Sequence, residues 1–167
     1  MALSMYAASV PVFKKMLGNL AAILARAEAH AAERKIEPAA LLQARLYPDM
    51  FPLLRQVQVA ADFAKGASAR LAGEEVPRYD DLEQGFGDLQ QRIARTIAFI
   101  DSLSPDAFDG SEERAIVTGS GAKVKHFRGQ DYLLHYALPH FYFHVTTAYA
   151  ILRHNGVEVG KKDFIGA

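Results

Sequence analysis

The sequence contains no cysteine, and this absence excludes several kinds of chemistry at once. Without thiols the chain has no disulfide, no thiolate metal ligand and no cysteine nucleophile. It also lacks a surplus of either charge, because 19 basic side chains balance 19 acidic ones. A chain without a basic surplus gives no electrostatic reason to expect nucleic acid or an anionic membrane as a partner.

Long apolar runs are missing as well. No stretch of about 18 apolar residues occurs, so a transmembrane helix is not predicted. Residues 1–12 lack a basic segment followed by an uninterrupted apolar one, and we therefore expect no signal peptide and a cytoplasmic protein. Gly119–Gly121 is too short for a phosphate-binding loop, and no serine lies in a motif for nucleophilic catalysis.

Apolar residues at helical spacing are abundant. The chain has 167 residues, of which 50% are hydrophobic, which is enough for one domain with a single core. Steps of three and four residues between apolar positions predict four long amphipathic helices. We therefore predict one all-α domain spanning residues 1–167, a four-helix bundle. The expected helices cover about residues 4–31, 49–72, 81–104 and 130–154.

Local signals refine the third and fourth predicted helices. Asp80 and Glu83 have the spacing of a capping box, so the third helix is expected to begin directly after Asp80. Pro139 lies inside the fourth helix, where it should produce a kink and free the carbonyl group of His135.

The segment between these two helices has a different pattern. Residues 114–118 and 122–127 flank Gly119–Gly121, and the second arm alternates polar and apolar side chains. This pattern favours a small β-hairpin or an extended loop packed on the helices.

A histidine pair is the most promising functional feature. Five of the six histidines lie between His126 and His154, and His140 and His144 are one helical turn apart. This spacing places both rings on one face, where two imidazoles can hold one divalent metal at about 2.0–2.1 Å per bond. Further ligands would have to come from another helix. In the simpler alternative, one histidine is a hydrogen-bonded core residue and the other reaches water.

The run from His140 to Arg153, followed by Gly156, resembles the last helix of the DinB/YfiT-like metalloenzyme superfamily. In that superfamily a histidine pair of this spacing precedes a leucine-arginine and a glycine. The stretches Leu138–His144 and Gly160–Phe164 are similar to an uncharacterised bacterial branch of it, a domain of unknown function. The resemblance covers essentially the whole chain. It implies an up-down-down-up four-helix bundle, frequent homodimers and a divalent metal (Zn, Ni or Fe) held by three histidines.

The resemblance places His140 and His144 on the histidine pair of the family, and it places the third ligand near Gln56 on the second helix. The sequence departs from the family pattern here, because an amide oxygen is a poorer ligand for zinc or nickel than imidazole. The same helix carries other oxygen donors, and tyrosines elsewhere can supply hydroxyl groups to a ligand. Polar residues of this kind lie more often on a solvated or intersubunit face, and tyrosines in helical bundles are more often packing residues. The expected lining of the pocket is Tyr6, Gln58, Asp62 and Tyr149.

Three functions are compatible with these features. The first is a metal-dependent hydrolase or thiol transferase, in which the metal at the histidine pair activates water or a thiol; the reaction type comes from the resemblance alone. The second is a non-catalytic protein that binds a small molecule and has lost the metal. The third is a dimerisation module whose apolar stripes form an intersubunit surface. The sequence favours the first two about equally and identifies neither substrate nor reaction.

Overall fold

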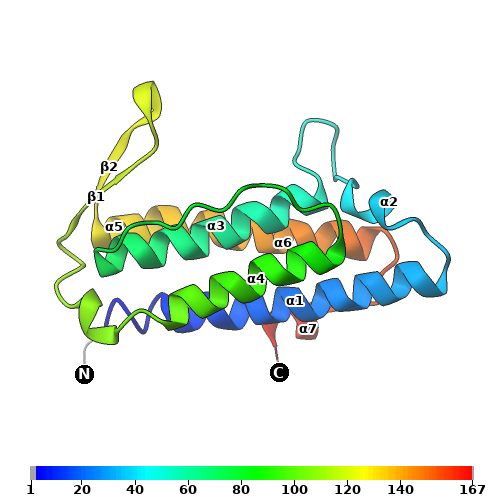
Figure 1. The fold of residues 1–167 in the computed structure, drawn as a ribbon, viewed down its shortest axis with the longest axis horizontal. Helices are drawn as coiled ribbons and strands as arrows, with labels where there is room; N and C mark the ends of the chain where they lie inside the picture. The colour runs from blue at the N-terminus through cyan, green and yellow to red at the C-terminus, as the bar shows by residue number, and fades with distance from the viewer. Residues whose placement is uncertain (1–2, 167) are drawn as a thin grey trace.

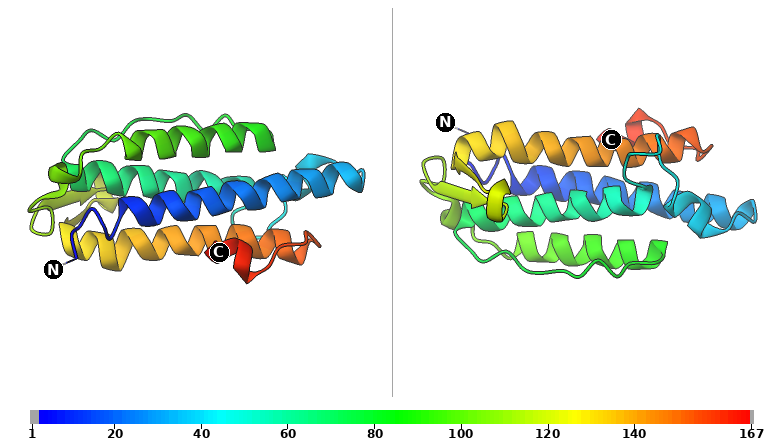
Figure 2. Two further views of the ribbon diagram at one scale, coloured as in Figure 1. Left: turned by 90° about the horizontal axis from the view of Figure 1, so that it is seen from below. Right: turned by 90° about the horizontal axis from the view of Figure 1, so that it is seen from above.

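Four long helices dominate the structure, a computed structural model that describes residues 3–166. They lie side by side, with α1 and α6 running in one direction and α3 and α4 in the other (Figures 1 and 2). Helix α3 packs on α4 and α6, and α1 packs on the same two helices from the other side. The prediction of a mostly helical chain is confirmed. The four helices are α1 (Val10–Glu33), α3 (Leu53–Ala72), α4 (Phe86–Asp101) and α6 (Leu138–His154).

The core is built from the apolar stripes of these four helices. Phe13 of α1 and Phe141 of α6 are fully buried, and their rings meet edge to face with centroids 4.9 Å apart. Between residues 3 and 166, no helix combines the length and apolarity needed to cross a membrane. The short elements are α2 (Pro38–Leu42), η1 (Pro105–Phe108), η2 (Gly121–Lys123), α5 (Gly129–Tyr132) and α7 (Lys161–Ile165).

Three predicted helix starts are wrong. Helix α1 begins at Val10 rather than near residue 4, and residues 5–9 form turns before it. Helix α3 begins at Leu53 rather than near Asp49, because Pro52 restricts the residue before it to extended conformations and ends any earlier helix. Helix α4 begins at Phe86 rather than after Asp80. Its cap is Asp88, whose carboxylate accepts hydrogen bonds from the backbone N–H groups of residues 84 and 85 at 2.9 and 3.1 Å.

Residues 74–85, the strap, instead run extended beside the long helices from the end of α3 to the start of α4 (Figure 1). The path of the strap explains why α3 and α4 run in the same direction. Tyr79 of the strap lies between Lys65 and Arg95, whose charged groups are 3.8 and 4.0 Å from the centre of its ring. Leu82, which lies inside the predicted third helix, is 77% exposed.

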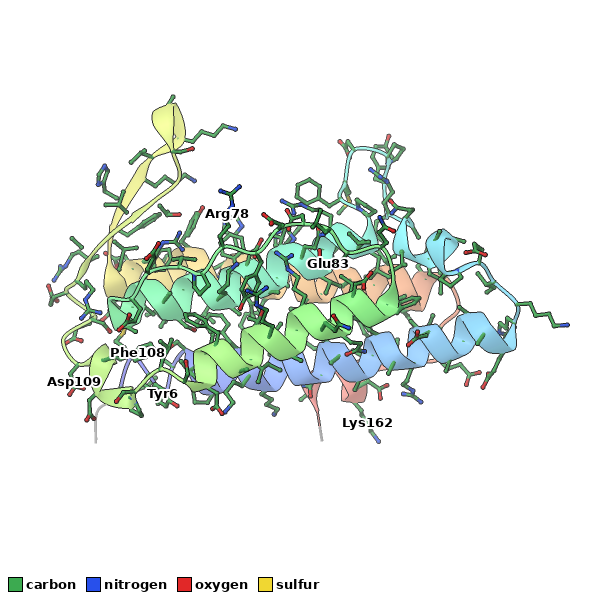
Figure 3. All side chains as sticks on the ribbon, viewed as in Figure 1. Tyr6, Arg78, Glu83, Phe108, Asp109 and Lys162 are labelled. Carbon is green, nitrogen blue, oxygen red and sulfur yellow. The ribbon has the colours of Figure 1, made fainter. Side chains whose placement is uncertain are left out.

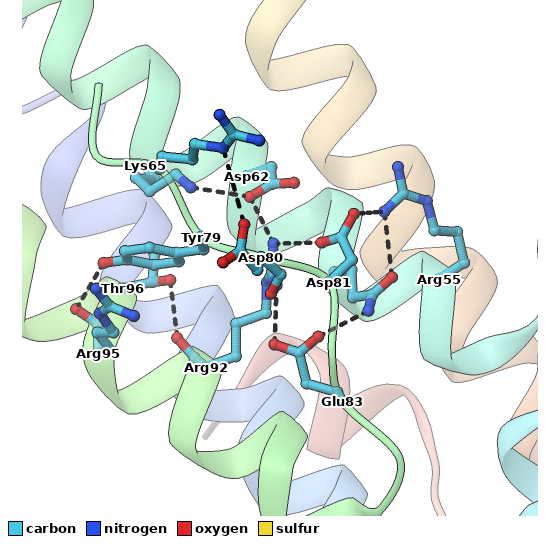
Figure 4. Close-up of polar contacts among 12 residues, drawn as sticks. Arg55, Asp62, Lys65, Tyr79, Asp80, Asp81, Glu83, Arg92, Arg95 and Thr96 are labelled. Atoms are coloured by element: carbon cyan, nitrogen blue, oxygen red, sulfur yellow. Dashed lines mark hydrogen bonds and ion pairs between the residues drawn. The ribbon is translucent and has the colours of Figure 1, made fainter. Parts of the chain in front are cut away.

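A buried arginine holds the strap against α3 and α4 (Figure 4). The side chain of Arg92 is 1% exposed, and it pairs with Asp62, Asp81 and Glu83 at 2.8, 3.0 and 2.8 Å. Burial opposes ionisation of Glu83, but hydrogen bonds from Arg92 and Gln58 outweigh it and hold the pKa of Glu83 below its ordinary value. Glu83 therefore binds Arg92 of α4 and Gln58 of α3 instead of completing a capping box with Asp80.

The helical run around Pro139 contains a π-helical segment. Helix α5 continues into η3 (Leu133–Ala137), a π turn, and then into α6. The N–H group of Leu138 donates to the carbonyl of Leu133, five residues earlier. The wider turn makes room for the ring of Pro139, which has no N–H group to donate to His135.

The predicted β-hairpin is confirmed. Strands β1 (Ala115–Thr118) and β2 (Lys125–Arg128) pair antiparallel, with Ile116 opposite Phe127. The hairpin projects from the face formed by α3 and α6, and the loop between α2 and α3 projects from the same face farther along (Figure 1). This face therefore has a raised segment near each end.

Candidate functional site

His140 and His144 lie on the face of α6 that is directed toward α3. Their ring centroids are 6.4 Å apart and their planes differ by 19°. His144 is 7% exposed, and His140 is half-buried. The two rings are thus stacked along α6, on the side of this helix that faces α3.

A hydrogen bond between helices sets the protonation of His144. Its Nδ1 lies 2.7 Å from Oε1 of Gln56 on α3, while the amide nitrogen of Gln56 donates to the backbone carbonyl of Phe51 at 3.0 Å. Because that donation leaves Oε1 facing the ring, Nδ1 of His144 must be the donor. Nε2 therefore carries the lone pair, on the ring edge directed away from Gln56.

Aromatic side chains enclose the histidine pair. Phe63 of α3 stacks on His140, with ring centroids 4.5 Å apart and an angle of 11° between the planes. Tyr136 contacts the same imidazole edge to face at 4.6 Å, and Phe51 stacks on His144 at 6.4 Å. Rings from α3, from η3 and from the loop before α3 therefore hold the imidazole rings in place.

An open groove of about 520 Å³ lies beside the pair. Two phenylalanines at its margin are unusually accessible, with Phe51 49% and Phe143 55% exposed. The groove is therefore mainly apolar, with two imidazoles as its polar groups. Its lining is Phe51, Pro139, His140, Phe143 and His144.

Both histidines are neutral at pH 7. Burial, followed by the charges of His140 and Arg55, lowers the pKa of His144 to about 4. Burial and the ammonium group of Lys125 lower the pKa of His140. The two imidazoles are therefore hydrogen-bonding groups, and at neutral pH they carry no charge.

The donors at the pair do not fit the three-ligand metal that the family resemblance implies. Among residues 3–166, no three His, Cys, Asp or Glu side chains come together in a metal-binding group. The oxygen of Gln56 is hydrogen-bonded to the ring of His144, so it is not a free ligand. Zinc sites in proteins ordinarily have at least three protein ligands, and only two imidazoles are available here.

Gln58 and Asp62 do not line this groove, which corrects the sequence-based prediction. Gln58 donates from its amide nitrogen to Glu83 of the strap at 2.7 Å. Asp62 pairs with Arg92 at 2.8 Å and Lys65 at 3.1 Å (Figure 4). Both side chains therefore lie on the side of α3 that faces α4, where Gln58 binds the carboxylate of Glu83 and Asp62 binds the cationic groups of Arg92 and Lys65.

The two predicted tyrosines also lie elsewhere. Tyr6 packs edge to face on Phe108 at 5.3 Å, at the end of the molecule near the N-terminus (Figure 3). Tyr149 packs on Phe164 of α7 at 6.0 Å. Five residues after His144, it is turned about 140° around the helix at 3.6 residues per turn, so it faces another neighbour.

Sequence reasoning missed Phe51, Phe63 and Lys125. A signal existed for Phe63, because it follows Gln56 by seven residues, two helical turns, and therefore shares its face. Phe51 lies in a loop, and Lys125 reaches the site from the hairpin, so no periodic pattern connects them with the histidines.

The fold is that of a DinB-like helical protein. A crystal structure described as a DinB family member from Shewanella denitrificans superposes with a TM-score of 0.91 and is 44% identical. The alignment covers 98% of this chain and 92% of that one. Residues 5–165 match the profile of the family called Domain of unknown function (DUF1993), and the chain belongs to this family. No curated protein matches it. The predicted resemblance is confirmed.

Proposed function

We propose that the protein binds a small organic molecule in the groove at His140 and His144 without a metal ion. The hydrogen bond between Gln56 and His144 carries this proposal. It engages the side-chain oxygen of Gln56, the residue at which the family resemblance places the third metal ligand. The same bond presents Nε2 of His144 as a neutral acceptor. Such a site is suited to a ligand with an apolar body and one hydrogen-bond donor.

The groove supplies both kinds of contact. Phe51 and Phe143 are half exposed at its margin, and covering their rings removes apolar surface from water at about 25 cal/mol per Å². A ligand N–H or O–H group bonded to Nε2 of His144 would contribute about 0.5–1.5 kcal/mol and fix the orientation of the ligand.

The metal-dependent hydrolase or thiol transferase remains the second candidate, with two imidazoles as its support. It needs a further ligand that the described residues do not place at the pair. We also propose that α1, α3, α4 and α6 form the up-down-down-up bundle of the superfamily, and that the protein is a cytoplasmic homodimer. Sedimentation at micromolar concentration tests the dimer.

A ligand screen with two histidine variants tests the proposed function. Small organic ligands should raise the melting temperature of the wild type, whereas Zn²⁺ and Ni²⁺ should not. His144→Phe keeps the ring and removes Nε2, so ligands with a donor group should bind about 2- to 12-fold more weakly. His154→Phe, at an exposed position on the same helix, should change nothing.

Two results would overturn the proposal. One is about one equivalent of tightly bound transition metal in protein purified without a histidine tag, which would support the metal-dependent candidate. The other is equal stabilisation of wild type and His144→Phe by every ligand, which would place binding elsewhere.

A further inference from the structure

An aromatic strip runs along α5, η3 and α6 and ends in the two histidines that line the groove. It consists of Tyr132, Tyr136, His140 and His144, which follow one another at intervals of four residues. Consecutive ring centroids are 5.9, 4.6 and 6.4 Å apart. Phe63 of α3 lies against the middle of the strip and contacts its last three rings. The strip is therefore a continuous row of rings, in which Tyr132 is buried and the rings of Tyr136 and His140 are partly exposed.

The hairpin borders the strip at the end opposite the groove. Phe127 of β2 packs on Tyr136, with ring centroids 4.9 Å apart. The ammonium group of Lys125 lies 5.0 Å from the centre of the same ring. The raised face between the hairpin and the loop before α3 (Figure 1) thus has an aromatic floor and a cation at its hairpin end.

Two cationic side chains act on the histidines of the strip. Lys125 is exposed and has no ion-pair partner among residues 3–166. The side chains with a permanent charge that act on the two histidines are Lys125 and Arg55, both cationic. Arg55 is already paired with Asp81 at 2.6 Å, so Lys125 is the cation available to a ligand.

We infer that the ligand is an elongated organic anion, whose apolar body lies along the aromatic strip and whose negative group lies at Lys125. The inference rests on the proposed function and names the chemical class of its ligand. From Tyr136 to His144 the helix rises about 12 Å, at 1.5 Å per residue, which sets the length that such a ligand can span. An aromatic or alkyl carboxylate has this form.

Two probes of one skeleton test the charge. Phenylbutyrate and phenylbutanol differ in carrying a carboxylate or a hydroxyl group. Calorimetric titration of the wild type at low salt should give tighter binding of the carboxylate. Lys125→Gln should weaken phenylbutyrate binding about two- to fivefold, the range of an exposed ion pair, and leave phenylbutanol unchanged. Added salt should remove the difference. Lys123→Gln, an exposed position on the same hairpin, is the matched control.

The outcomes separate the two proposals. If the wild type binds both probes equally and Lys125→Gln affects neither, the anion inference is wrong while the groove remains a binding site. An equal loss with Lys123→Gln likewise overturns the role of Lys125. If neither probe binds or shifts the ¹⁵N resonances of His144, the anion inference is wrong, and the ligand screen with His144→Phe tests the proposed function separately.

Discussion

Replacing Gln56 by glutamate should convert His144 from a neutral side chain into a titrating one near neutral pH. In the wild type, an uncharged amide oxygen accepts the Nδ1–H bond at 2.7 Å, and the pKa of His144 is lowered to about 4. Glutamate has nearly the same shape and places a negative charge at that oxygen. A carboxylate in contact with an imidazole stabilises the imidazolium form.

The size of the effect follows from the contact. An opposite charge within about 4–6 Å ordinarily changes a pKa by about 1–3 units. The pKa of His144 in Gln56→Glu should therefore lie between about 5 and 7, a coupling of about 1.4–4 kcal/mol. The variant also loses the amide donor to the carbonyl of Phe51, so at neutral pH its unfolding free energy should fall by about 0.5–1.5 kcal/mol.

The assay is titration of the imidazole ¹⁵N resonances, which report both pKa and tautomer. Gln91→Glu makes the same charge change at an exposed position of α4 and should leave His144 unchanged. An unchanged pKa in Gln56→Glu would refute the reasoning. So would a wild-type spectrum with the proton on Nε2, because the Gln56 bond would then run in the opposite sense.

Three further outcomes are expected. First, the pKa of His144 is about 4 in the folded chain, whereas a histidine in the unfolded chain takes up its proton near pH 6.5. Acidification from pH 6.5 to 4 should therefore lower the unfolding free energy by up to about 3 kcal/mol. In denaturant titrations, His144→Phe should flatten that part of the pH profile. Second, Gln56→His should add a third imidazole beside the pair, and dialysed protein should retain about one equivalent of Zn²⁺ by mass spectrometry; the same low occupancy as the wild type would contradict the assigned place of Gln56. Third, a Cβ on Gly129 would overlap the carbonyl oxygen of Ser111, so Gly129→Ala should lower the free energy of unfolding by at least about 1–3 kcal/mol, as measured by thermal unfolding. Gly18 lies in α1 with open space around the Cβ position, so Gly18→Ala should raise the free energy of unfolding by about 0.5–1 kcal/mol.

Helical periodicity was sufficient to predict most of the secondary structure. Apolar steps of three and four residues located α1, the body of α3 and the helical run that ends at His154, because one buried face per helix is a local property of the sequence. Alternating polarity around Gly119–Gly121 likewise indicated the hairpin.

The start of α4 could not be predicted in this way. Asp80 and Glu83 have the spacing of a cap, but Glu83 binds Arg92 and Gln58 in the folded chain. Those partners lie on α4 and α3, and a local pattern contains no information about them. Competition from buried tertiary partners outweighs a capping preference of about 1 kcal/mol.

The candidate site likewise has one feature that the sequence predicts and several that depend on the tertiary structure. The spacing of His140 and His144 by itself places their rings on one helical face, because 3.6 residues per turn is a property of the backbone. Only the packing of α3 on α6 decides that Gln56 bonds to Nδ1 and that Phe63 covers the imidazoles. Only the position of the hairpin decides that Lys125 reaches the strip. These contacts join residues far apart in the chain, and their chemistry depends on burial and distances that exist only in the folded protein.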